Sequence, residues 1–196
     1  MASTKLSLES LEDRRLLSLS VPQYSSLASA PATLYLDFNG NTESSWGGYQ
    51  NVETPAYDTD GNSQSFSTQE KAAIKEIWAR VAEDFVPFNL NVTTVDPGGW
   101  SNPNTSALRV AIGGSHTDWF VANASGAAYQ NAYSNPYPNV VFVFEDDLYN
   151  GLPSMVADIA SHEAGHAFGL RHNHEYDSNG NVIGEYTTGN SPEWAP

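Results

Sequence analysis

The chain has 196 residues, enough for one domain with a substantial core, and its 40% of hydrophobic residues exclude a disordered chain. The formal net charge of -15 disfavours nucleic acid and anionic membranes as partners, because both repel a polyanion. No apolar run reaches the length of a membrane span, and the lack of cysteine excludes disulfides and thiolate metal sites.

The first 30 residues differ in composition from the rest of the chain. They are rich in Ser and Leu, and the stretch LLSLSV is too short and too polar for the core of an ordinary signal peptide. The stretch LESLEDRRLLS is similar to a short N-terminal segment found on many exported bacterial proteins. We therefore expect a mobile export leader over residues 1–30, one domain over residues 31–196, and a secreted or cell-surface protein.

The first half of the domain predicts a strand, a long loop and a helix. Residues 32–40 predict a strand that ends in a turn, and the polar residues 41–66 predict a loop. Ser67 and Glu70 have the spacing of a capping box at a helix start, and Pro87 predicts the end of that helix. Its apolar residues at helical spacing are Ile74, Ile77, Trp78, Val81 and Phe85.

The second half predicts several strands and a second helix. The segment 126–130 (GAAYQ) fits a short edge strand, whereas 140–146 (VVFVFED) is typical of a strand buried on both faces. Further strands are expected at 89–95 and 107–114. From about 154 to 170 the pattern is helical, with one apolar side made of Val156, Ala160, Ala164 and Ala167. This order predicts an α/β (α+β) domain, with one sheet and helices packed on it.

The second helix carries a cluster of histidines. His162 and His166 are four residues apart, so they share one face of the helix. Gly169 can end the helix in a left-handed conformation and return the chain, so that His172 reaches the same point. Three imidazoles with a fourth position open are typical of a catalytic zinc. Glu163 lies about 100° around the helix from His162, where a general base is needed.

Two alternatives compete with this interpretation. A histidine cluster can lie on the surface without any metal, but chance would produce this extended motif only on the order of 10⁻⁵ times in such a chain. His174 could also replace His172 as the third ligand, although the spacing of the motif favours His172.

The stretch HEAGHAFGLRH is similar to the elongated zinc motif of the metzincin metallopeptidases. The order of elements also resembles the upper subdomain of that fold, a twisted, mostly parallel sheet with two helices. The resemblance implies a zinc-dependent endopeptidase acting on proteins or peptides. It implies zinc ligands His162, His166 and His172, with Glu163 as general base.

The resemblance also bears on the substrate and on the end of the chain. It implies that substrate lies against the edge strand, held by the backbone of Ala127, Ala128 and Tyr129. Metzincins place a methionine turn after the third histidine, but Met1 and Met155 both precede the motif. We therefore expect the C-terminal part of the catalytic domain to be missing, and residues 1–196 to bind zinc but to cleave poorly.

A second class of function is a non-catalytic zinc- or calcium-binding cell-surface module, which would have no need of Glu163. Calcium is suggested by DTDGN (58–62) and DSNGN (177–181), whose oxygen side chains alternate. Neither matches the EF-hand, with its glycine at position six and glutamate at position twelve. The alternative is a pair of hairpin turns. The acidic residues 145–147 predict a solvated strand end rather than a metal site.

Overall fold

The computed structural model describes residues 19–100, 106–134, 138–172, 175–179 and 181–184. Its centre is a five-stranded sheet made of β1 (Ala32–Asp37), β4 (Leu90–Thr93), β5 (Ala107–Ile112), β6 (Gly126–Ala127) and β7 (Val140–Val143). The strand order is β4-β1-β5-β7-β6. All neighbours pair in parallel except β6, which is antiparallel to β7 at one edge. The predicted mixed α/β class and the mostly parallel sheet are confirmed.

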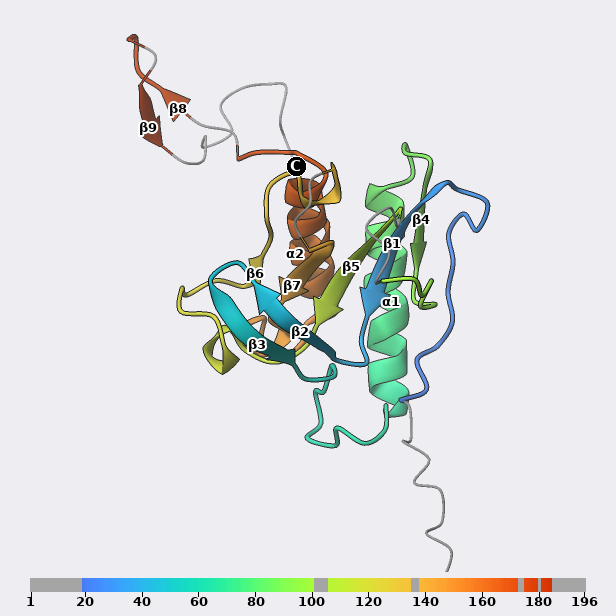
Figure 1. Cartoon of the computed structure of the whole chain (residues 1–196). Coiled ribbons are helices and arrows are strands. Elements are labelled where there is room, and N and C mark those ends of the chain that lie inside the picture. Colours follow the sequence, from blue (N-terminus) through green and yellow to red (C-terminus); the bar gives the residue numbers. More distant parts are fainter. Residues whose placement is uncertain (1–18, 101–105, 135–137, 173–174, 180, 185–196) are drawn as a thin grey trace, which may run out of the picture.

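Two helices, α1 (Thr68–Asp84) and α2 (Pro153–Ala167), lie side by side on one face of the sheet (Figure 1). The predicted capping box starts α1: the Ser67 hydroxyl accepts from the Glu70 N–H at 3.2 Å, and the Glu70 carboxylate accepts from the Ser67 N–H at 2.7 Å. The predicted apolar faces are buried against the sheet, with no exposed surface on Ile74, Ile77, Val81, Val156, Ala160, Ala164 and Ala167.

The opposite face of the sheet is covered by a β-hairpin, so the prediction of a loop over residues 41–66 is wrong for its first half. Strand β2 (Asn41–Trp46) pairs with β3 (Tyr49–Thr54) across a Gly47–Gly48 turn. Trp46 anchors the hairpin, donating from its indole to the Val140 carbonyl at 3.2 Å and packing on Phe142 with ring centres 5.3 Å apart. The hairpin was missed because its strands bury few apolar residues, although Gly-Gly is a hairpin-turn signal.

Residues 19–30 of the expected leader run along the outer edge of β4. Ser25 pairs with Thr93, and the backbone N–H groups of Ser26 and Thr94 donate to the carbonyls of Val92 and Tyr24 at 3.0 and 3.1 Å. These backbone hydrogen bonds fix the segment, in contrast to the expectation of a mobile chain as far as residue 30. Residues 1–18 lie outside the described part of the chain.

The remaining elements are short. They are the 3-10 helices η1 (His116–Asp118), η2 (Ala132–Ser134) and η3 (Glu145–Asp147), and the antiparallel pair β8 (Glu175–Tyr176) and β9 (Val182–Gly184). The turn between β8 and β9 holds the second acidic loop, which confirms the hairpin-turn alternative for residues 177–181. Within the described residues, neither helix is long and apolar enough to cross a membrane.

Candidate metal centre

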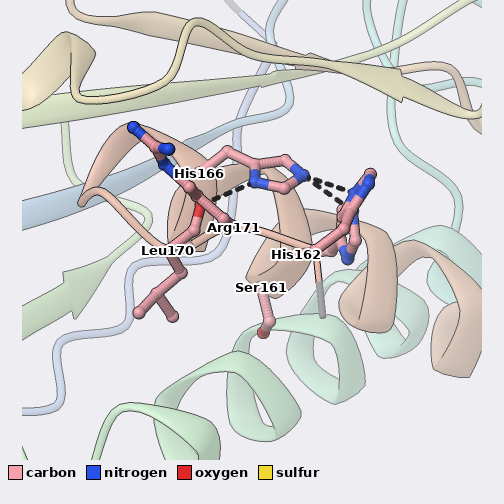
Figure 2. A pocket seen from close by; sticks show the side chains of 7 residues that line it. Ser161, His162, His166, Leu170 and Arg171 are labelled. Carbon is pink, nitrogen blue, oxygen red and sulfur yellow. Dashed lines mark hydrogen bonds between the residues drawn. The ribbon is translucent and has the colours of Figure 1, made fainter. Parts of the chain in front are cut away.

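Three histidine side chains converge at the end of α2. The Nε2 atoms of His162, His166 and His172 lie 2.9, 3.0 and 3.1 Å from one another. They line a cavity of about 280 Å³ with Ser161, Leu170 and Arg171, and Figure 2 shows His166 directing its ring toward His162. These three nitrogen atoms lie close enough together to hold one metal ion.

The chain reaches this geometry through the way α2 ends. Gly169 has φ +103°, a left-handed conformation that favours glycine. The Gly169 N–H donates to the His166 carbonyl and the Leu170 N–H to the Gly165 carbonyl, both at 2.9 Å. This pair of bonds is a Schellman motif, which closes the helix and reverses the chain. The predicted role of Gly169 is confirmed, and the reversal brings His172 beside the helix.

A hydrogen bond on the side of the ring away from the cluster fixes the orientation of His166. Its Nδ1 lies 2.9 Å from the Leu170 carbonyl oxygen. A carbonyl only accepts, so Nδ1 must carry the proton and Nε2 presents its lone pair to the cluster. Burial lowers the pKa of His162, and the neighbouring His166 and His172 lower it further. His162 thus favours its neutral form, which is the form of an imidazole that binds a metal.

Glu163 follows His162 in α2 and is not part of the histidine set that could hold a metal. Its side chain is 7% exposed and makes no hydrogen bond within the described part of the chain. Burial raises the pKa of this carboxyl to about 7. A Cβ built on Gly126 would lie 2.8 Å from Oε1 of Glu163, so the carboxylate abuts the edge strand β6. The sequence predicted that Glu163 lies beside a bound metal but gave no signal for its contact with Gly126.

The edge strand is shorter than predicted, because β6 contains only two of the residues 126–130. Ala127 is buried against the aromatic cluster under the hairpin, and the Tyr129 ring packs on Trp46 with centres 4.4 Å apart. Ala128 follows between them and is packed at the edge of the main core. The Tyr129 side chain therefore supports the hairpin, while β6 keeps its place at the edge of the sheet next to β7.

The helix-ending turn gives a first test. We expect Gly169→Ala to lower the free energy of unfolding by about 1–3 kcal/mol, the usual range for a strained backbone conformation. Its new Cβ would also meet the Asn131 amide oxygen at 2.7 Å. Because the same turn carries His172, metal affinity should fall with stability. Urea unfolding and competition with a chromogenic chelator measure the two effects.

The matched control is Gly165→Ala. Gly165 is helical, and its added Cβ would lie 3.4 Å from the nearest atom, on Leu170, which is ordinary contact. Alanine is favoured over glycine inside a helix by up to about 1 kcal/mol, so this variant should match or exceed the parent in stability. Unchanged metal affinity in Gly169→Ala would show that the turn does not position His172.

His174, the alternative third ligand, lies outside the described residues. A scan against protein-family models found no match to this chain, and a search of curated proteins found none.

Proposed function

We propose that the chain is a zinc-dependent endopeptidase of the metzincin type, with zinc held by His162, His166 and His172. The observation that carries the proposal is the convergence of three Nε2 atoms within 3.1 Å, with the buried Glu163 beside them and not among them. The similarity of HEAGHAFGLRH to the metzincin motif supports it.

The donor set fits zinc. Nitrogens about 3.0 Å apart each lie about 1.7 Å from the centre of their triangle, so one ion can contact all three at the 2.0–2.1 Å typical of zinc and histidine. Three protein ligands match catalytic zinc sites, whereas structural sites use four. The Leu170 carbonyl behind His166 is the kind of partner that orients a ligating imidazole.

Zinc, when bound, would supply Lewis-acid chemistry, making water more acidic and polarising a carbonyl group. Glu163 would take the proton from the attacking water and deliver it to the leaving amine. Its position suits both steps, because it lies beside the histidines without a competing hydrogen bond. A carboxyl with a pKa near 7 exchanges protons readily at neutral pH.

The substrate would be an extended peptide added to the edge of the sheet. Strand β6 is the last in the sheet order and has no strand partner on its outer side within the described residues. An extended peptide can pair with such an edge through backbone hydrogen bonds. The backbone of Ala127, Ala128 and Tyr129 would position it, next to the Glu163 carboxylate. Secretion or cell-surface exposure is proposed from the LESLEDRRLLS segment alone.

Metal removal tests the proposal. We expect 1,10-phenanthroline to abolish cleavage of a denatured protein substrate by the full-length protein, and one equivalent of zinc to restore it. Elemental analysis of the untreated protein should give one zinc per chain. The non-chelating isomer 1,7-phenanthroline is the control and should have no effect.

Zinc-loaded full-length protein that cleaves no peptide bond would contradict the enzyme and favour the non-catalytic binding module. Cleavage that survives complete zinc removal would show that the histidine cluster is not the catalytic centre.

A further inference from the structure

A second group of acidic side chains lies around the loop from β3 into α1, at the end of the sheet toward which the arrows of β1 and β5 point in Figure 1. Carboxylate oxygens of Asp58, Asp60 and Glu70 lie within 4.8 Å of one another. Oxygens on opposite sides of a calcium ion are about 4.6–5.2 Å apart, because each Ca–O distance is about 2.3–2.6 Å. The three side chains are therefore close enough to share one ion.

Hydrogen bonds account for the shape of this loop without any ion. Asp58 Oδ1 accepts from the N–H groups of Asp60, Gly61 and Asn62 at 2.7–3.1 Å. The two oxygens of Glu70 accept from the N–H groups of Thr59 and Ser67. The loop precedes a helix instead of joining two strands, so the hairpin-turn alternative is wrong for residues 58–62.

The hydrogen bonds within the loop do not account for the burial of the Glu145 carboxyl. It was predicted to lie in a solvated strand end, yet it is 1% exposed, because η3 turns it under the loop. Its Oε1 accepts from the Asp58 N–H at 3.2 Å. Its Oε2 is buried and has no hydrogen-bond partner among the described residues. Such an atom is strongly unfavourable unless a donor or a cation meets it.

The buried carboxyl lines an acidic cavity. The cavity measures about 310 Å³, and Glu145 lines it together with Asp58 and Asp146. No ion pair in the described part of the chain involves any of these three residues. Burial raises the pKa of Glu145 to about 9, and the charges of Asp146 and Asp58 act in the same direction. These surroundings therefore disfavour a charged Glu145 carboxylate unless a cation balances it.

We propose that one calcium ion binds at Asp58, where the carboxylate group of Asp58, Asp60 and Glu70 meets the cavity lined by Glu145 and Asp146. The donors are all oxygens, which hard cations prefer. Calcium accepts six to eight oxygens in flexible geometry, whereas magnesium requires an octahedron at about 2.0–2.1 Å and is usually held by one or two carboxylates. A pocket with this many carboxylates therefore suits calcium.

The ion would tie the start of α1 to the start of α2. The loop holding Asp58 and Asp60 leads into α1, and the Glu145 carbonyl accepts from the Gly151 N–H at 2.8 Å, two residues before α2 begins. Calcium would therefore stabilise the base of the helix that carries His162 and His166, without touching the histidine cluster.

The test is calcium binding to the full-length, zinc-loaded protein. Isothermal titration with CaCl2 should give one site per chain. At a calcium concentration about 100-fold above Kd, Tm should rise by about 5–10 °C, and equal MgCl2 should give a much smaller rise. No rise with calcium, or an equal rise with both salts, would overturn the proposal.

Two single substitutions test which carboxylates bind the calcium ion. Glu145→Gln and Asp60→Asn should each weaken calcium binding at least tenfold and remove most of the Tm rise. Glu145→Gln should be at least as stable as the parent when calcium is absent, because it removes a buried acid. Asp60 is exposed, so its variant tests the site even if the buried one fails to fold.

Glu53→Gln is the matched control, since it removes one exposed carboxylate from β3 and should leave calcium binding unchanged. His166→Ala should also keep the calcium response, which separates this proposal from the proposed function. A full response in both Asp60→Asn and Glu145→Gln would place the ion elsewhere and refute the site.

Discussion

His166→Ala should remove zinc from the folded protein. His166 contributes one of three converging nitrogens, 3.0 and 2.9 Å from those of His162 and His172. Loss of a residue that merely supports a ligand costs about 10–100-fold in metal affinity, so loss of the ligand itself should exceed 100-fold. Elemental analysis and chelator competition measure the loss. Peptide cleavage should disappear with the metal.

His116→Ala is the matched control, because it removes the same side chain from the other end of the sheet. His116 bonds to Asp147 at 2.8 Å and takes no part in the cluster. Its variant should keep one zinc per chain. Retention of full zinc by His166→Ala, with the fold intact, would refute the metal centre.

Glu163→Gln should keep the zinc and lose catalysis. General acid–base groups contribute about 10²–10⁴-fold to a rate, so kcat should fall by at least about 100-fold. The amide has nearly the same shape as the carboxylate but cannot accept the proton of the attacking water. Because Glu163 makes no hydrogen bond within the described residues, its replacement should leave the fold undisturbed. Zinc content and the rate on a denatured protein are measured together.

Asp158→Asn is the control on the same helix, since Asp158 is an exposed carboxylate about one turn before His162. It should leave both zinc content and rate unchanged. Zinc loss from folded Glu163→Gln would instead make Glu163 a ligand. An unaltered rate would exclude it from the chemistry.

The features that the sequence predicted correctly depend on local rules. The Ser67–Glu70 capping box, the buried faces of α1 and α2 and the turn at Gly169 each follow from spacing within a few residues. The approach of His172 to His162 follows from the same turn. These parts of the fold and of the site could be predicted because their partners lie close together along the chain.

The features that the sequence missed depend on distant partners. The hairpin of β2 and β3 forms because Trp46 finds Phe142, about a hundred residues away, and its own strands show little alternation. Glu145 is buried because the loop at Asp58 covers it. The packing of Glu163 on the edge strand is likewise a contact between separate elements. No pattern within a short stretch of the sequence predicts contacts between elements that lie far apart along the chain.

The absence of a side chain at position 126 sets a limit on engineering this protein. A methyl group there would come within 2.8 Å of the Glu163 carboxylate and equally close to Ile159. A mutagenesis library aimed at new peptide preferences should therefore leave Gly126 unchanged. Any larger residue at position 126 would displace the carboxylate of Glu163, the proposed base. A loss of activity in such a variant would therefore reflect the displaced carboxylate and not a change in the preference for peptide substrates.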